Sequence, residues 1–245
     1  MEKKLKIKTS DSKLINGTFV ATKQKTNTLV VFVHGFTGNR NVRLIYNGAK
    51  FFTKKGFDTF RFDLYGKNKG SRRFRDTKIS LHGEDITIVL KYFRKKYKNI
   101  YVVGHSYGGT SLLFTDQSII DGFVFWDASY VESTENNTAG MRYSKELDAY
   151  ILGGGVETVI GKEFVEELKN FSDCGELIKK INKPVLFVTA GKKGNSKAGK
   201  KYFIKANNPK KLINIKTANH NFDNWNDEET LFRETYGWLR KVTSD

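Results

Sequence analysis

The chain alternates short apolar runs with longer amphipathic segments, and this alternation constrains its fold more than any other feature. Six apolar runs, most of which end in small or polar residues, are "TLVVFVHG" (28–35), "FDTFRFD" (57–63), "NIYVVGHS" (99–106), "DGFVFWD" (121–127), "KPVLFVTAG" (183–191) and "KLINIKTA" (211–218). Segments with helical periodicity include 41–56, 79–97 and 227–242. Strands that alternate with helices form a mainly parallel sheet covered on both faces. The sequence therefore predicts an α/β fold.

Two stretches depart from this alternation. The N-terminal segments "KLKIKT" and "KLINGTFVAT" alternate polar and apolar residues around a Ser-Asp-Ser turn signal, which predicts an antiparallel hairpin. Between Asp127 and Pro184 the chain is far longer than one crossover needs. We interpret residues 129–182 as a helical cap with a glycine hinge at 153–155. The cap is inserted before the penultimate strand of a core formed by residues 1–128 and 183–245.

The composition suits one domain with an inserted cap, but it is strongly basic. Among 245 residues, 43 Lys and Arg face 26 Asp and Glu, which gives a net charge of +17. Such an excess raises the question of a nucleic-acid or anionic-membrane partner. The lysines are spread over most of the chain and no nucleic-acid motif accompanies them. We interpret the charge as a solvated surface and expect no specific nucleic-acid partner.

The remaining composition argues against a metal site and a membrane span. The single cysteine, Cys174, cannot form an internal disulfide, and the four histidines are scattered without metal-ligand spacing. The N-terminus has no apolar run of signal-peptide length, and no stretch holds the roughly 18 apolar residues that a transmembrane helix needs. We therefore expect a cytoplasmic protein, and the oligomeric state is left open.

One motif carries chemistry: "GHSYG", residues 104–108, has the form G-x-S-x-G. A nucleophile at a sharp turn from strand to helix has strained backbone angles and close neighbours, so a glycine two residues away on each side relieves the crowding. The β-type run "IYVV" precedes the motif and the helix-compatible "TSLLFTDQ" follows it. The context predicts that Ser106 is a nucleophile; the alternative is a structural turn serine.

Together with "HGFTGNR" (34–40), "FDLYGKNKGS" (62–71) and "ANHNF" (218–222), this motif resembles the α/β-hydrolase family over nearly the whole chain except the cap. The chain is most similar to small carboxylesterases of the cinnamoyl/feruloyl esterase type, and also to serine aminopeptidases and monoacylglycerol lipases. The resemblance implies acyl transfer without a cofactor and a small-molecule ester as substrate. A lactonase, thioesterase or peptidase would use the same groups. The rival from another class is a non-catalytic binding protein on a decayed hydrolase scaffold.

The resemblance also implies a role for particular residues. The oxyanion of the reaction would be held by the backbone amides of Phe36 and Tyr107, although Phe36 could equally form a pocket wall. His34 is more consistent with loop support than with a base. The family orders its triad as serine, acid and histidine, and His220 is the one histidine after Ser106. His220 is therefore the predicted base.

The third triad residue is not where the family places it. In the resembling proteins, the strand that matches "PVLFVTAG" ends in a glycine, and the catalytic aspartate lies three residues after that glycine. This chain has Gly194 at that position, followed by Asn195. The segment 191–201 holds no carboxylate. Asp127 ends the preceding strand, and some hydrolases of this fold carry the acid there, so we predict that Asp127 orients His220. The alternatives are Asn195, an acid in the cap, or a dyad, with Asp127 only capping a turn.

The same segment looks superficially like a phosphate-binding loop. "GNSKAGKK" (194–201) fits G-x-x-x-x-G-K-[ST] except at the last position, where a lysine replaces the hydroxyl that would hold magnesium. The sequence favours a solvated basic loop over a nucleotide site.

Overall fold

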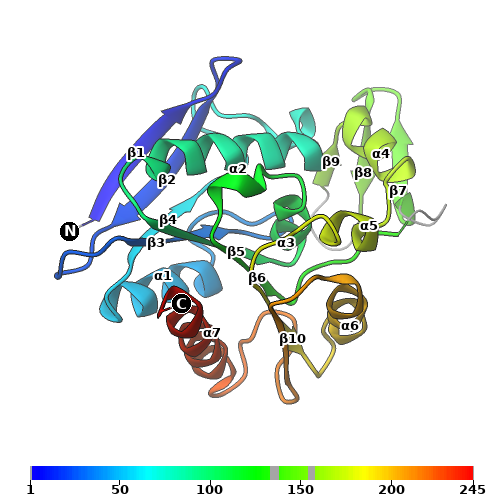
Figure 1. Cartoon of the computed structure of the whole chain (residues 1–245). Coiled ribbons are helices and arrows are strands. Elements are labelled where there is room, and N and C mark those ends of the chain that lie inside the picture. Colours follow the sequence, from blue (N-terminus) through cyan, green and yellow to red (C-terminus); the bar gives the residue numbers. More distant parts are fainter. Residues whose placement is uncertain (1, 133–137, 154–157, 245) are drawn as a thin grey trace.

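The computed structural model describes residues 2–132, 138–153 and 158–244, and an eight-stranded sheet runs through its centre (Figure 1). The strand order is β1-β2-β4-β3-β5-β6-β10-β11. These strands are β1 (Glu2–Lys8), β2 (Leu14–Val20), β3 (Thr28–Val33), β4 (Asp58–Phe62), β5 (Asn99–His105), β6 (Gly122–Trp126), β10 (Val185–Ala190) and β11 (Lys210–Ile215). The first two form an antiparallel hairpin, and all neighbours from β4 to β11 pair in parallel. The predicted hairpin and parallel sheet are confirmed.

Helices cover both faces of the sheet (Figure 1). α1 (Arg43–Lys54) and α7 (Asp227–Ser244) lie on one face, and α2 (Ile79–Arg94) and α3 (Tyr107–Leu112) lie on the other. The central strands supply side chains to both layers in alternation: Val31 and Val33 of β3 face α2, whereas Val30 and Phe32 face α1 and α7. Because every central strand is buried on both faces, it is a continuous apolar run in the sequence.

The insertion between β6 and β10 differs from the expected helical cap in its first half. It begins with a small antiparallel sheet of β7 (Met141–Ser144), β8 (Ala149–Leu152) and β9 (Thr158–Ile160), and only then continues as α4 (Lys162–Lys169) and α5 (Cys174–Ile178). Tyr143 pairs with Tyr150 across the first hairpin, with ring centroids 5.3 Å apart. Such cross-strand aromatic pairs stabilise a sheet that propensity alone does not reveal. Gly154 and Gly155 of the predicted hinge lie outside the described residues.

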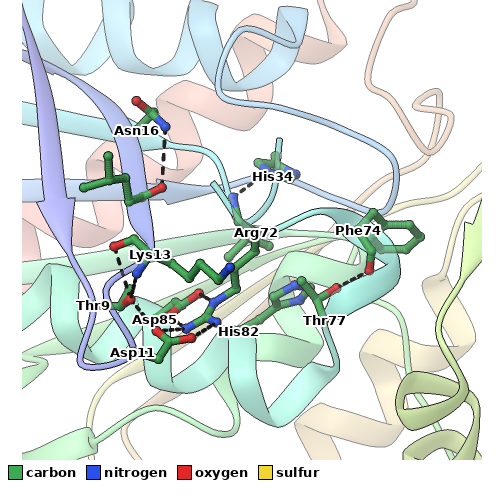
Figure 2. Close-up of polar contacts among 12 residues, drawn as sticks. Thr9, Asp11, Lys13, Asn16, His34, Arg72, Phe74, Thr77, His82 and Asp85 are labelled. Carbon is green, nitrogen blue, oxygen red and sulfur yellow. Dashed lines mark hydrogen bonds and ion pairs between the residues drawn. The ribbon is translucent and has the colours of Figure 1, made fainter. Parts of the chain in front are cut away.

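An ion-pair network fixes the segment that leads from β4 to α2 (Figure 2). The Arg72 guanidinium lies between Asp11, in the turn of the N-terminal hairpin, and Asp85 of α2, at 2.5 and 2.7 Å. Nearby, the amide of Leu14 donates to the carbonyl of Gly70 at 2.9 Å. Asp85 is buried, so removing Arg72 would leave a buried charge without a partner. The network therefore holds this loop against both the hairpin and α2.

Candidate active site

Ser106 lies at the turn between β5 and α3, with φ at +54° and ψ at −124°. Positive φ is costly for a residue with a side chain, and such strain is found most often at functional sites. The flanking glycines are required by contact. A Cβ at Gly104 would lie 2.7 Å from the Cα of Gly109, and one at Gly108 would lie 2.5 Å from the carbonyl oxygen of His34. The turn therefore holds the serine in a conformation that larger neighbours would prevent.

The structure brings Ser106, His220 and Asp127 together in one chain of hydrogen bonds. Nε2 of His220 lies 2.9 Å from the Ser106 Oγ, and its Nδ1 lies 2.6 Å from Oδ2 of Asp127. An ionised carboxylate only accepts hydrogen bonds, so Nδ1 carries the proton and donates it to Asp127. Nε2 is then free to accept from the serine hydroxyl. In this geometry the imidazole has the tautomer that a general base requires.

The carboxylate of Asp127 is bound by the loop after β10, the segment that contains no carboxylate of its own. Asp127 follows β6 at φ +43° and is fully buried. It accepts from the backbone amides of Ala190 and Asn195 at 2.9 Å, and the Asn195 side-chain amide donates to the Asp127 carbonyl at 2.9 Å. α6 (Ser196–Lys205) begins directly after Asn195, and a helix N-terminus favours negative charge. This glycine- and lysine-rich loop therefore surrounds an anion of its own chain.

Gly194, at the position where the resemblance led us to expect the acid, has no room for a side chain in this conformation. A Cβ there would lie 2.4 Å from the Cβ of Ala190 and 3.0 Å from Oδ2 of Asp127. The interpretation of 194–201 as a solvated loop is corrected, because the segment becomes helical at Ser196. Gly199 of α6 packs closely on β10, since a Cβ there would lie 2.1 Å from the Thr189 Cγ2.

Phe36 and Tyr107 are the predicted oxyanion donors: Phe36 lines the same cavity as Ser106, and Tyr107 follows Ser106 in the chain. Within the described part of the chain, no residue accepts a hydrogen bond from either backbone amide. Tyr107 is the first residue of α3, where the amide has no partner inside the helix. The Phe36 ring packs edge-on against Tyr107 and Phe74, with centroids 5.7 and 5.0 Å away. The amide and the ring of Phe36 thus have separate surroundings, and both roles considered for this residue are compatible with its position.

A comparison of sequences identifies the family of the chain. Residues 28–159 match the family model described as the alpha/beta hydrolase fold. The chain belongs to the α/β-hydrolase family. This match covers more than half of the chain and includes β5 and β6, the strands that Ser106 and Asp127 follow. No curated protein sequence matches this α/β hydrolase.

Solved structures of similar fold include several esterases. Est1E from Butyrivibrio proteoclasticus, with ferulic acid bound, has a TM-score of 0.84 at 21% identity, covering 98% of this chain and 100% of its own. The esterase domain of a Rhodothermus marinus protein has a TM-score of 0.75 at 18% identity, covering 98% of both chains. Dienelactone hydrolase from Anabaena variabilis reaches 0.72 at 14%, covering 98% and 97%. The resemblance to the feruloyl esterase type is confirmed in the fold.

Two further histidines of this α/β hydrolase support the site. Leu64 donates its backbone amide to Nε2 of buried His34 at 3.1 Å, so Nδ1 carries the proton and donates to the Gly35 carbonyl at 2.8 Å. Both ring nitrogens are thus occupied in holding the loop that contains Phe36. Burial lowers the pKa of His34, which keeps the ring neutral. His34 is accordingly placed as a loop support and not as a base.

His105 is a site residue that the sequence did not single out. Its Nε2 donates to the backbone carbonyl of His220 at 2.9 Å, and the two rings lie 4.9 Å apart. Burial lowers the pKa of His105 to about 4, so the ring is neutral at physiological pH. The signal available in the sequence was its place beside Ser106 in the G-x-S-x-G motif. Through His105 the nucleophile turn and the base loop are directly linked.

Ser106 and His220 open into a cavity of about 440 Å³. Phe36 and Asn221 also line it, and Arg43 at its edge donates to the Asn221 carbonyl at 2.9 Å. The described residues include no cluster of three or more metal-ligating side chains. They also include no helix long and apolar enough to cross a membrane.

Proposed function

We propose that the chain is a serine-dependent carboxylesterase that cleaves small to medium carboxylic esters through an acyl-enzyme on Ser106. The observation that carries this proposal is the unbroken hydrogen-bond chain from Asp127 through His220 to Ser106. The related folds add support, since several are esterases and the Est1E structure holds ferulic acid.

In the proposed reaction, His220 removes the proton of Ser106 as its Oγ attacks the ester carbonyl carbon. The carbonyl oxygen becomes an oxyanion, which the amides of Phe36 and Tyr107 stabilise. His220 then donates its proton to the departing alcohol, leaving an acyl group on the serine. Water, activated by the same imidazole, hydrolyses this acyl-enzyme and restores the free hydroxyl.

Asp127 would keep the imidazole in its productive state. By accepting from Nδ1 it fixes the tautomer that can receive the serine proton, and it stabilises the imidazolium that follows. The amides of Ala190 and Asn195 hold the carboxylate oriented toward His220.

The insertion at 129–182 would act as a cap on a core of residues 1–128 and 183–245. Phe164 of α4 lies against Phe36 and Tyr107, with ring centroids 6.2 and 5.8 Å away. The cap thus borders the residues proposed to bind the oxyanion. In this reading it selects among substrates, while the core supplies the catalytic groups.

Labelling with a fluorophosphonate probe tests the proposal. We expect stoichiometric modification of Ser106, identified by peptide mass spectrometry, and none in a Ser106→Ala variant that is folded by circular dichroism. Folded wild-type protein that remains unlabelled would favour the non-catalytic binding protein instead. A screen of esters, lactones, thioesters and amides would then distinguish the hydrolase classes that share these groups.

A further inference from the structure

A second cavity, of about 840 Å³, adjoins the one that contains Ser106. Gly38 lines both, so the loop that carries Phe36 forms the border between them. The far wall comes from the segment after β4, and Thr158 and Val159 of the insertion close another side. A substrate lying across Ser106 can therefore extend past Gly38 into this space.

The lining of this cavity is basic. The stretch 64–75 holds five cations and no carboxylate, and Lys67, Arg73 and Arg75 from it reach the cavity. Asp63, the carboxylate in the lining, forms an ion pair with Arg40, and its other oxygen accepts from the Arg40 amide at 2.8 Å.

The availability of these three cations differs. Arg75 donates to the Leu147 carbonyl at 3.1 Å. Among the described residues, Lys67 and Arg73 have no carboxylate within ion-pair distance. Within the described parts of the chain, these two cations have no acidic partner, and they lie on a loop held in place by the ion pairs of Arg72 (Figure 2).

An aromatic surface connects these cations to the proposed oxyanion site. The rings of Tyr65 and Phe74 line the cavity with centroids 4.5 Å apart. Phe74 in turn contacts Phe36 at 5.0 Å. A ligand that follows this surface needs an apolar body near Phe36 and a negative group beyond it.

The position of His220 decides which half of an ester faces this cavity. The departing alcohol must contact His220, which lines the first cavity together with Asn221 and Asp223. None of these three residues lines the second cavity. The acyl half is therefore the half that extends past Gly38.

We propose that the substrate is an ester whose acyl part ends in a carboxylate, bound by Lys67 and Arg73. This inference rests on the proposed esterase function and specifies its substrate class as half-esters of dicarboxylic acids. One water is consumed, the ester bond breaks, and the products are the free dicarboxylic acid and the alcohol. Arg73 is suited to the carboxylate because its planar guanidinium can donate two parallel hydrogen bonds.

The test compares 4-nitrophenyl monoesters of adipic, suberic and sebacic acid with the same compounds capped as methyl esters. Chains of this length disfavour the intramolecular attack that hydrolyses shorter half-esters spontaneously. We expect kcat/KM for the best free carboxylate to exceed that of its capped partner by about tenfold at low salt, the equivalent of about 1.4 kcal/mol. This preference should decline as the ionic strength rises toward roughly 0.3 M. The Debye length is about 10 Å at ~0.1 M and shorter at higher ionic strength, so exposed charge pairs are then screened.

A double variant, Lys67→Gln with Arg73→Gln, should lower the ratio of kcat/KM on the free carboxylate to kcat/KM on its capped partner to within about twofold. The matched control is Lys50→Gln with Lys54→Gln, which removes the same charge from exposed positions on α1 and should retain the preference. Equal rates on free and capped esters in the wild type would overturn this inference and leave the esterase proposal intact. Absence of turnover on all of them, together with an unlabelled Ser106, would remove both.

Discussion

The carboxylate of Asp127 has partners on two sides, and a neutral replacement cannot satisfy both. The amides of Ala190 and Asn195 require an acceptor, and Nδ1 of His220 donates to the remaining side. An asparagine at 127 would keep its oxygen toward the two amides and present its NH₂ group to His220. The imidazole would then carry its proton on Nε2, where it cannot accept from Ser106.

We therefore expect Asp127→Asn to retain the fold and lower kcat by roughly 10⁴-fold, the scale seen when a triad acid is neutralised. Steady-state kinetics on a 4-nitrophenyl ester measures this. Asn195→Ala is the matched comparison, because it keeps the backbone amide and loses only the side-chain bond to the Asp127 carbonyl. It should cost about tenfold or less. Near-normal turnover in Asp127→Asn, or a collapse in Asn195→Ala, would return the catalytic role to the loop.

A second prediction concerns Gly194. Gly194→Asp would place a Cβ against Ala190 and a second carboxylate beside Asp127, so it should lower the free energy of unfolding by about 1–3 kcal/mol. Urea denaturation measures the change. Combining it with Asp127→Ser should recover only the part that comes from repulsion between the two carboxylates, since the contact with Ala190 remains. A single variant as stable as the wild type would show that the loop can move away at little cost.

Ser106 was predicted from the G-x-S-x-G motif between a strand and a helix, whereas His220 and the backbone amides of Phe36 and Tyr107 were predicted from the resemblance to α/β hydrolases. Asp127 was predicted because the family's usual position holds Gly194, because Asp127 ends the preceding strand, and because some hydrolases of this fold carry the acid there. The His105 contact could not be read from the sequence. It depends on where the loop that carries His220 returns to β5, a meeting of residues 115 positions apart.

At the scale of elements, periodicity predicted the central strands and the flanking helices, because burial on both faces leaves a continuous apolar run. It did not predict β7 to β9. Those strands are short and partly exposed, so their alternation of polar and apolar residues is too brief to distinguish them from a helix. α6 was also not predicted. Only two of its positions, Gly199 and Tyr202, are buried, and the lysines around them leave no clear apolar periodicity.

The insertion should favour short acyl chains over long ones. Its Tyr143 and Tyr150 line a separate surface cavity of about 460 Å³ with Lys162, Glu163 and Glu166, and Ile151 is buried in the insertion itself. These apolar groups do not extend the cavity of Ser106. In a series of 4-nitrophenyl alkanoates we expect kcat/KM to fall beyond about ten carbons, because longer chains would leave apolar surface in water. A strong preference for chains longer than this would contradict the assignment.

At the scale of the whole molecule, three buried histidines should make the protein sensitive to acid. Burial lowers the pKa of His34, of His82 to about 3 and of His105 to about 4. In the unfolded chain each titrates near 6.5, so between roughly pH 6.5 and 4 the unfolded state binds more protons than the folded state. Stability is fully present above this window and is lost as the pH falls through it.

His82 and His105 each contribute up to about 1.4 kcal/mol per pH unit, so the two together give a slope of about 3 kcal/mol per unit at its steepest, and His34 adds to it in the same direction. Urea unfolding at pH 7, 6 and 5 would measure the slope. His82→Gln removes one of the titrating groups and should lower the slope by about 1.4 kcal/mol per pH unit. A free energy of unfolding that stays constant across these pH values would refute the assignment of neutral buried rings.

The net charge of +17 belongs to the whole surface, and we expect only weak binding to polyanions. Mixed-sequence DNA or vesicles with anionic lipid should bind at low salt and dissociate by about 0.2 M, because such contacts depend on counterion release and screening. Fluorescence anisotropy and vesicle sedimentation across a salt series would detect it. Binding that is selective for one sequence, or that persists above this salt concentration, would indicate a dedicated surface.

The close approach of Gly194 to Asp127 also bears on how such a site can change during evolution. With the loop in this conformation, a side chain at 194 would meet both Ala190 and the Asp127 carboxylate, so under the proposed role of Asp127 the residues at 127 and 194 are coupled. A lineage that moves its acid from one strand to the next must change both positions, and each change alone is unfavourable. Among homologues, a carboxylate at one position should therefore accompany a small residue at the other. This covariation would identify the move of the acid more clearly than either residue alone.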